Sequence, residues 1–532
     1  MLIDARSLPQ PLDETIHADL CVVGAGPAGM TIAMELAGAG IHICVVESGG
    51  EAPTNSDQRL ARGENADPFY YRLDRTRIRS FAGTSNHWDP RGMIARPLDP
   101  LDFEDRPEVG RWGWPFDRAH LDPYYQRAQA IIKLGPCEYD VAAWGEGERT
   151  RRLDLGNDVL TTMYQRAEVG NFQRYRSSLA RLHDVQVLLH ATALELVTNE
   201  AGDHVDHLEV TLGGGRRCRV TAREFILAAG AIENARLLLL SRLTHRRGLG
   251  NRHDLVGRYF MEHPHAPSGV LHPSHDSVTA RIAPYELRVL HGTKVWWALT
   301  IGEQALRRER ILGSAWALRL ATAPLVSDTA RALLDCKKTL TSYRRPVPGT
   351  GRRVRAVAGH PLDVARILRS AWARRTGNTA PTRALLTFSA EQNPNPASRV
   401  TLGRRRDHNG QPQARLDWRL TDLDHRSIRV AQEMIDRAFR GSGLGWMSSR
   451  FGEENPPVAL GGGFHHMGTT RMHQDPAQGV VNADGRVHGL DNLFVTGSSV
   501  FPSSGFANPT LTVVALAIRL AEHVRAILDR HA

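Results

Sequence analysis

The chain has 532 residues, of which 41% are hydrophobic, and this length exceeds what one compact core supports, so we expect two joined domains. Its formal net charge is +10, yet residues 336–375 alone hold eleven Lys or Arg residues against one Asp. Because neither a helix-turn-helix pattern nor interleaved aromatic and basic residues accompany this local surplus, composition and charge argue against a nucleic-acid partner.

The five cysteines are widely spaced and include no Cys-x-x-Cys pair, which argues against a disulfide framework and against a zinc site. The first twenty residues lack the basic start and apolar run of a signal peptide, and no uncharged apolar stretch of about 18 residues follows. We therefore expect a soluble, cytoplasmic protein without a resident metal ion.

Residues 18–47 read as a strand, a glycine turn, a helix and a second strand. The turn has the spacing GxGxxG, in which Gly24 makes the tight turn, Gly26 lets the backbone approach a pyrophosphate, and Gly29 lets the helix pack closely. The helix N-terminus offers free N–H groups to the phosphates, and Glu47 is placed to accept hydrogen bonds from a ribose. This unit predicts a dinucleotide site, for either NAD or FAD.

Four further stretches carry recognisable patterns. Residues 80–89 (SFAGTSNHWD) form a small-residue loop that includes His87, and in isolation this loop reads equally well as a turn with a packed Trp. Residues 220–241 repeat the strand, glycine turn and helix pattern, and GRYFMEHP follows at 257–264. The last stretch, residues 461–512, opens GGGFHHMGTTRMH and closes GSSVFPSSGFANPTLT, and we interpret it as the wall of an active site.

Together these stretches resemble the glucose-methanol-choline (GMC) family of FAD-dependent oxidoreductases, most closely its pyranose oxidase and sugar dehydrogenase branch. The resemblance implies an α/β fold, α+β overall, with a Rossmann-like FAD-binding domain and a substrate domain whose antiparallel sheet is flanked by helices. Alternating segments at 294–301, 398–402 and 414–420 fit such a sheet. The implied FAD-binding segments are 1–95, 185–265 and 455–532, with a lid or connecting segment at 96–184 and a substrate domain at 266–454 that contains a basic insertion at 325–380.

The resemblance also assigns residues to the cofactor FAD. In pyranose oxidase the corresponding His of the 80–89 loop is covalently bonded to the flavin, and here His87 is expected either to form that bond or to contact the isoalloxazine ring. Ala193 matches the place where the family's backbone meets the adenine, and Ala229 ends a strand of the sheet, where open α/β folds bind ligands. Besides the GxGxxG glycines and Glu47, the other implied contacts are Gly83, Thr84, Asn86, Gly497, Ser498, Pro509 and Thr510.

Oxidation of an alcohol by a flavin requires a base for the hydroxyl proton, a hydride acceptor and a group that holds the developing alkoxide. The resemblance implies that His465 is the base, with its neighbour His466 as the competing candidate. Adjacent residues on a strand point to opposite faces, so only one of the two should face the substrate. Asn508 matches the second catalytic position, although Asn508 and Pro509 also suit the start of the last helix as N-cap and first residue.

The predicted activity is FAD-dependent oxidation of a secondary hydroxyl of a pyranose or glycoside to a ketosugar, with hydride transfer to flavin N5. The alternative is the catalytic subunit of a sugar, sugar-acid or other alcohol dehydrogenase that passes electrons to a quinone or cytochrome partner. The sequence leaves open whether O2 or another molecule accepts the electrons.

Two polar or basic segments in the middle of the chain admit two interpretations each. Residues 361–375 can form a helix with apolar residues on one face and arginines on another, which either packs on its own domain or docks on a membrane or an electron-transfer partner. Gln392, Asn393 and Asn395 precede the segment 398–402 and serve either turn formation or contact with a sugar.

Overall fold

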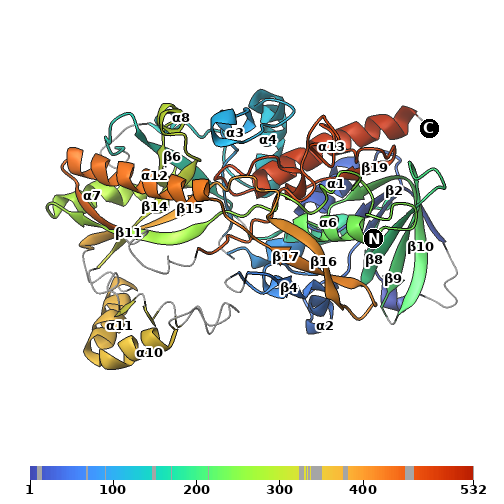
Figure 1. Cartoon of the computed structure of the whole chain (residues 1–532), viewed down its shortest axis with the longest axis horizontal. Helices are drawn as coiled ribbons and strands as arrows, with labels where there is room; N and C mark the ends of the chain where they lie inside the picture. Colours follow the sequence, from blue (N-terminus) through green and yellow to red (C-terminus); the bar gives the residue numbers. More distant parts are fainter. Residues whose placement is uncertain are drawn as a thin grey trace.

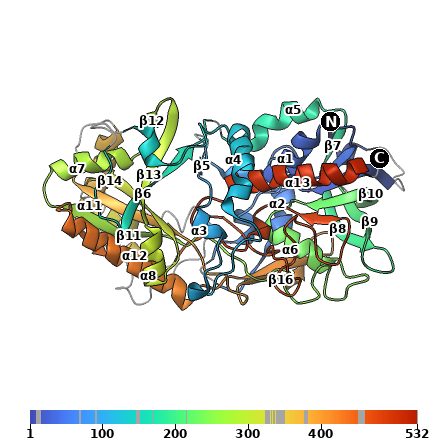
Figure 2. The same cartoon turned by 90° about the horizontal axis from the view of Figure 1, so that it is seen from above.

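The computed structural model of the chain describes residues 1–8, 15–67, 70–89, 92–145, 151–168, 170–213, 215–322, 329–330, 332–333, 336, 350–375, 381–449 and 460–530. Two lobes lie side by side along the long axis of the molecule, and each is built around one eight-stranded sheet (Figures 1 and 2). Much of the basic insertion predicted at 325–380, including Lys337, Lys338, Arg344 and Arg345, lies outside the described residues.

The first sheet combines strands from both ends of the chain in the order β1-β7-β3-β2-β10-β9-β8, with β19 beside β10. Neighbouring strands from β1 to β10 in this order pair in parallel, and so do β10 and β19. By contrast, β9 pairs antiparallel with both β10 and β8. The strands are β1 (Leu2–Asp4), β2 (Thr15–Val23), β3 (Ile43–Val46), β7 (Val185–Leu189), β8 (Ala191–Thr198), β9 (Val205–Leu212), β10 (Arg216–Leu227) and β19 (Leu493–Val495).

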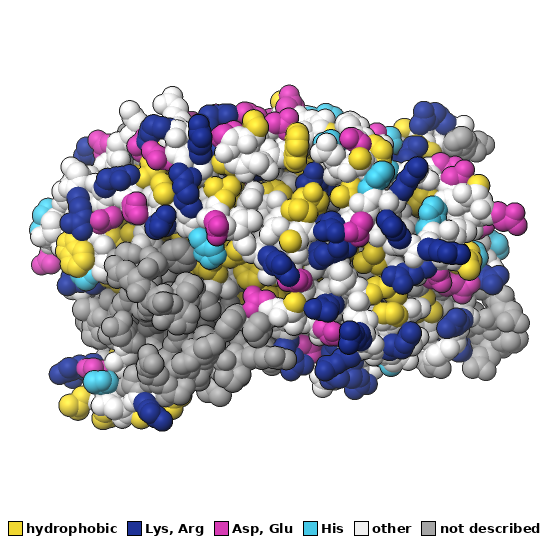
Figure 3. Space-filling model, in the orientation of Figure 1, with side chains coloured by type: hydrophobic (Ala, Val, Ile, Leu, Met, Phe, Trp, Pro, Cys, Tyr) yellow, Lys and Arg dark blue, Asp and Glu magenta, His cyan; other side chains and the backbone are white. Residues whose placement is uncertain are grey.

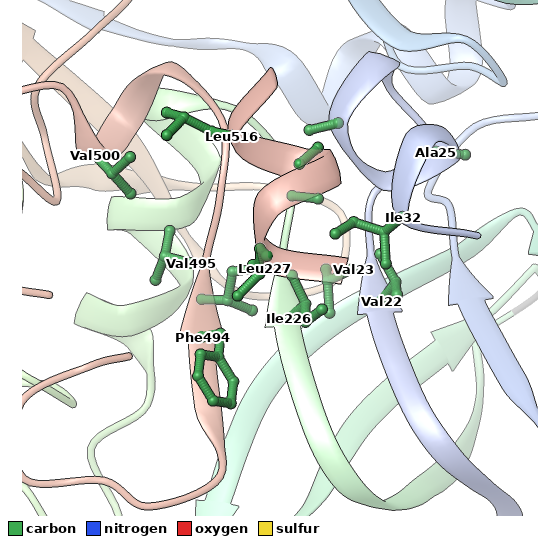
Figure 4. Packing of buried hydrophobic residues seen from close by; sticks show 14 of the residues in the cluster. Val22, Val23, Ala25, Ile32, Ile226, Leu227, Phe494, Val495, Val500 and Leu516 are labelled. Carbon is green, nitrogen blue, oxygen red and sulfur yellow. The ribbon is translucent and has the colours of Figure 1, made fainter. Parts of the chain in front are cut away.

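Helices α1 (Pro27–Leu36), α6 (Ala231–Leu240) and α13 (Thr510–Arg530) pack around the ends of β2, β10 and β19 (Figure 4). Val22, Ile226 and Val495 from the three strands are fully buried there together with Ile32 of α1 and Leu516 of α13. Burial of each such side chain contributes about 1.5–3 kcal/mol, so this core fixes the strand ends relative to the helices. α13 also packs against α4 (Arg118–Ile132).

The second sheet has the order β18-β11-β15-β14-β13-β6-β5, with β12 beside β13, and all of its pairs are antiparallel. Residues of α12 (Asp422–Gly441) share a buried cluster with one face of the sheet. The strands are β5 (Ile94–Ala95), β6 (Val159–Arg166), β11 (His265–Pro273), β12 (Arg288–Leu290), β13 (Thr293–Ile301), β14 (Ser314–Ala321), β15 (Arg383–Ala390) and β18 (Gly445–Ser449). The predicted α/β fold, with an antiparallel sheet flanked by helices, is confirmed.

Two strand pairings run across the predicted domain limits. β6 lies within 96–184, which we expected to be a lid or connector, yet it pairs with β13 along seven residues. The predicted strands at 398–402 and 414–420 form as β16 (Arg399–Arg406) and β17 (Pro412–Asp417), but β17 pairs with β4 (Gly63–Asn65) in a separate three-stranded sheet. The domain limits therefore stay a prediction.

The remaining helices are short, apart from a helical pair that lies below the second sheet in Figure 1, α10 (Thr350–Gly359) and α11 (Pro361–Arg375). α11 has the bounds of the predicted helix, and Ile367 is buried, whereas Leu362, Leu368 and Trp372 are 74%, 64% and 66% exposed. The short helices are α2 (Asn55–Gln58), α3 (Pro100–Phe103), α5 (Arg176–Ala180), α7 (Ser277–Ile282) and α8 (Glu303–Glu309). Among the described helices, none has the length and apolar character needed to cross a bilayer.

Candidate active site

Three parallel strands of the first sheet end together, and a glycine follows each of them. Val23, Leu227 and Val495, the last residues of β2, β10 and β19, are register partners. Glycines follow at positions 24, 230 and 497, and a Cβ built on Gly230 or Gly497 would meet nothing within 4 Å. Ligands of open α/β sheets bind outside the carboxyl ends of the strands, so this edge is the candidate cofactor site.

The GxGxxG turn has the geometry that its three predicted roles require. A Cβ on Gly24 would lie 2.8 Å from Ala228 O and one on Gly29 would lie 2.0 Å from Gly24 O, whereas one on Gly26 would meet nothing within 4 Å. Gly26 is also the N-cap of α1 and offers no side chain to the first N–H groups of the helix. These donors and the open approach fit a pyrophosphate.

The carboxylate of Glu47 is held at the end of β3. Its Oε2 accepts from Ala25 N–H at 3.0 Å and its Oε1 from Gly49 N–H at 2.9 Å, while burial raises the pKa of this carboxyl. Ala191 N–H donates to Glu47 O at 2.9 Å, and Ala193 follows two residues later on β8. Glu47, predicted for the ribose, thus contacts the strand that carries Ala193, predicted for the adenine.

The loop that carries His87 lies over the glycine turn, since a Cβ on Gly83 would approach Gly26 Cα to 3.0 Å. The side chain of His87 is exposed, and its ring lies 5.7 Å from that of Phe464. Asn86, by contrast, uses its amide within the loop, where Nδ2 donates to Ser80 Oγ and Phe81 O at 2.9 Å. Any contact of Asn86 with FAD would therefore come from its backbone.

Several other residues predicted to contact the cofactor form hydrogen bonds within the protein. Ala229 N–H donates to Asn234 Oδ1 at 2.8 Å, Ser498 Oγ donates to His466 O at 2.6 Å, and Thr84 Oγ1 accepts from Ile78 N–H at 3.3 Å. The last helix begins at Thr510, one residue later than predicted, although Pro509 O accepts the first helical bond from Val513 N–H at 2.9 Å. The assignment of these residues to FAD stays a prediction.

The two predicted catalytic side chains lie together, with Asn508 Nδ2 3.3 Å from His465 Nε2. Both residues are only partly buried. His466 is 9% exposed and lies on another side of the segment, where its Nε2 is 3.0 Å from Tyr70 Oη. The two histidines have different partners, and the segment is a loop rather than the predicted strand, with a φ of 61° at Phe464. Which of the two faces the substrate stays a prediction.

A buried glutamate, which sequence reasoning missed, holds this loop in place. Glu262 is 0% exposed, and its Oε2 accepts the backbone N–H groups of His263, Gly463 and His465 at 3.2, 3.0 and 3.0 Å. Tyr70 donates to its Oε1 at 2.6 Å. Burial raises the pKa of Glu262 to about 7, against the hydrogen bonds, which favour the carboxylate. The available signal was an acid beside a histidine in GRYFMEHP.

Two further histidines were also missed. His263 Nδ1 lies 2.9 Å from His465 Nδ1, and His265 Nδ1 donates to His263 O at 2.8 Å. We call His263, His265, His465 and His466 the histidine cluster. Burial lowers the pKa of His263 to about 3, that of His265 to about 4 and that of His466 to about 3. Burial, and then the other members of the cluster, lower the pKa of His465 well below its ordinary value.

Gln392 supports the same loop from the second lobe. It is fully buried, and its Oε1 accepts from Glu262 N–H at 2.8 Å and from Trp418 Nε1–H at 2.9 Å. Asn395 serves the turn, because its Oδ1 accepts from Ala397 N–H at 2.9 Å. Of the two interpretations left open for these polar residues, turn formation fits Asn395, and Gln392 fits neither.

An aromatic wall, formed by Tyr164, Trp296 and Phe506, lies beside the site. Tyr164 and Trp296 are register partners on β6 and β13, with ring centroids 5.4 Å apart. Phe506 belongs to the same small cluster and precedes Asn508 by two residues. The guanidinium of Arg96 lies 5.1 Å from the Phe506 ring centroid. Because Tyr164 is 2% and Phe506 5% exposed, these rings pack on one another and support the segment that leads to Asn508.

The glycine turn at the end of β2 fits a dinucleotide cofactor, and the match to the FAD binding domain over residues 17–63 makes the chain a flavoprotein oxidoreductase. The chain is similar to the GMC oxidoreductases, whose family model matches residues 394–517. In the part of the chain that the structure describes, no group of three or more His, Cys, Asp or Glu side chains could hold a metal ion.

Full-length relatives include 6'''-hydroxyparomomycin C oxidase of Streptomyces lividus, with 26% identity over 96% of this chain and 93% of the relative. The 2-methyl-1,2-propanediol dehydrogenase of Mycolicibacterium austroafricanum is 24% identical over 96% of this chain and 95% of that one. C-glycoside 3-oxidase of Arthrobacter globiformis is 37% identical over 22% of each chain. The crystal structure of pyridoxine 4-oxidase has the same fold, with a TM-score of 0.54, 19% identity and coverage of 95% and 99% of the two chains.

Proposed function

We propose that this flavoprotein oxidoreductase oxidises a secondary hydroxyl of a pyranose or glycoside to the ketosugar. The observation that carries the proposal is the 3.3 Å contact between His465 Nε2 and Asn508 Nδ2, which places a base and a hydrogen-bond donor next to each other. His465 takes the hydroxyl proton at Nε2, and the Asn508 amide donates to the oxygen as its negative charge develops.

FAD, held by Gly26, Glu47 and the N-terminus of α1, would supply a hydride acceptor when bound. The neutral state of the histidine cluster supports this role for His465, because a base must be unprotonated before it acts. Asn508 does not titrate, so it donates a hydrogen bond at every working pH and leaves His465 as the one group that exchanges a proton.

One comparison favours a sugar over a small aliphatic alcohol. One relative is named as a C-glycoside 3-oxidase, which acts on a glycoside. The second full-length relative is named as a diol dehydrogenase, so a non-sugar alcohol is the alternative substrate.

The second candidate function is that of a dehydrogenase subunit that passes electrons to a quinone or cytochrome instead of O2. The surface of α11 favours this function, because Leu368 and Trp372 are exposed beside Arg369. Apolar and basic side chains mix in this way on helices that dock on anionic surfaces. Figure 3 shows Lys and Arg interspersed with Asp and Glu over the rest of the drawn face.

Anaerobic titration of the flavin-loaded protein with D-glucose, D-galactose, methyl glucosides and 1,2-propanediol tests the proposal. Loss of the oxidised flavin absorbance with a sugar supports it, and the rate of recovery in air separates an oxidase from a dehydrogenase. If dithionite and the diol reduce the flavin but no sugar does, the sugar assignment is wrong.

A further inference from the structure

A continuous chain of hydrogen bonds passes through two imidazole rings to the proposed base. His263 Nε2 lies 3.3 Å from Ser504 O, His263 Nδ1 lies 2.9 Å from His465 Nδ1, and His465 Nε2 lies 3.3 Å from Asn508 Nδ2. His263 is 0% exposed. Every polar atom of the His263 ring therefore has its partner within the protein.

The first end of this chain fixes the proton on His263. A backbone carbonyl can only accept, so His263 Nε2 must carry a hydrogen to bond with Ser504 O. A neutral imidazole carries one hydrogen, and burial among other histidines keeps His263 neutral. Its Nδ1 is therefore an unprotonated acceptor.

The proton on His465 follows from the contact between the two rings. Two unprotonated nitrogens cannot form a hydrogen bond, so the 2.9 Å contact requires His465 Nδ1 to be the donor. His465 Nε2 then holds the lone pair. The second end of the chain agrees, because the Asn508 amide nitrogen can only donate, and its neighbour is His465 Nε2.

We propose that His263 is a positioning residue that keeps His465 in the Nδ1–H tautomer, with Nε2 unprotonated and able to take the substrate proton. This inference rests on the proposed function, in which His465 is the base. When His465 becomes protonated at Nε2, its Nδ1–H bond to His263 becomes charge-assisted and therefore stronger. His263 thus orients the ring before the reaction and stabilises the imidazolium that forms.

The backbone around the two rings is built to keep them in contact. Glu262 accepts the N–H groups of both His263 and His465 with one oxygen, which ties together segments 202 residues apart. Gly463 provides the space, since a Cβ there would lie 2.9 Å from His465 Nδ1 and 2.7 Å from His265 Cε1. Any larger residue at 463 would force the His465 ring, the His265 ring or both to shift.

The direct test is the tautomer itself, measured by 15N NMR of the FAD-loaded protein with labelled histidine. We expect the His465 resonances, identified by their loss in His465→Gln, to show a protonated Nδ1 and an unprotonated Nε2. The reverse assignment in the wild-type protein would overturn the inference, and this readout requires neither substrate nor a variant of His263.

Two substitutions of His263 test its contribution to the reaction. In His263→Asn, Oδ1 takes the place of Nδ1 and still accepts from His465, whereas His263→Leu removes the acceptor. We expect flavin reduction by the fastest sugar of the panel to slow by about 100-fold in His263→Leu, and by less than about tenfold in His263→Asn, with KM changed little in both. Equal losses in the two variants, or wild-type rates in His263→Leu, would overturn the positioning role.

His465→Ala separates this inference from the function on which it rests. Wild-type reduction rates by sugar in His465→Ala would remove the base assignment and the role of His263 with it, whereas failure of every sugar to reduce the wild-type flavin would remove the proposed function. If His465→Ala is inactive and the wild-type His465 is protonated at Nε2, the function stands and the role of His263 falls. Flavin absorbance and the thermal unfolding temperature of each variant check that it has folded.

Discussion

His465 and His466 are adjacent in the sequence, yet they have different surroundings, and this difference can be tested. We expect His465→Ala to slow flavin reduction by about 100-fold or more and to keep bound FAD, because a general base typically contributes at least this factor. His466→Gln is the matched control: its side chain can still reach Tyr70, so its loss should be much smaller. Stopped-flow reduction under anaerobic conditions measures both.

The buried carboxyl of Glu262 predicts a particular pH dependence. Its pKa is raised to about 7, so the carboxylate that accepts the three N–H groups is lost as the pH falls below 7. The pKa of His465 is lowered well below its ordinary value, so this base stays unprotonated through the same range. We expect kcat/KM to decrease below about pH 7 as a single group, Glu262, becomes protonated, and we expect Glu262→Gln to abolish this decrease. If the decrease persists in Glu262→Gln, another group causes it.

Gly463 should be as sensitive as a catalytic residue although it has no side chain. In Gly463→Ala the new methyl group would collide with the rings of His465 and His265, so we expect slower flavin reduction with FAD still bound. Gly441, at the end of α12, is the control, since a Cβ there meets nothing within 4 Å and its φ is not positive. Gly441→Ala should keep the wild-type rate.

At the scale of elements, the pattern of residues predicted local structure well. The unit at 18–47 formed as β2, α1 and β3, and residues 361–375 formed a helix with the predicted bounds. These elements are encoded by glycine spacing and by apolar periodicity within one short segment. Pairing between distant segments is not encoded in this way, which is why neither β6 beside β13 nor β4 beside β17 could be predicted.

The candidate site was predictable to the same extent. His465 and Asn508 lie in motifs that the resemblance identifies, and the structure brings them together. Glu262 and His263 lie in the stretch GRYFMEHP, which carried the resemblance without a role for either residue. Their importance depends on hydrogen bonds to residues about 200 positions away, and no local periodicity records such contacts.

The start of α12 gives a stability prediction. Thr421 and Asp424 form a capping box, in which Thr421 Oγ1 accepts from Asp424 N–H, and Asp424 Oδ2 accepts from Thr421 N–H at 2.6 Å. We expect Thr421→Ala to destabilise the protein by about 1 kcal/mol and to lower its unfolding temperature. Thr421→Ser keeps the hydroxyl and should unfold close to the wild-type temperature in the same calorimetric scan. A similar loss in both variants would show that the methyl group, rather than the cap, contributes the stability.

At the scale of the whole molecule, the cofactor edge and the helical pair α10 and α11 lie in different lobes. The carboxyl ends of β2, β10 and β19 belong to the first sheet, whereas α11 lies below the second sheet (Figure 1). Sugar oxidation at the flavin and electron delivery to a partner would therefore use separate parts of the protein, and substitutions on α11 can distinguish the two half-reactions.

We predict that the double substitution Leu368→Glu and Trp372→Glu leaves flavin reduction by sugar within about twofold of wild type, because surface changes distant from a site rarely alter its chemistry. If α11 docks on an anionic membrane that contains the acceptor, reoxidation by quinone in phosphatidylglycerol vesicles should fall by about tenfold or more, since two apolar contacts become like charges to the surface. Reoxidation by a water-soluble quinone is the control and should not change. Equal vesicle rates in both proteins would remove the docking role of α11, and slower reduction by sugar would contradict the separation of the two lobes.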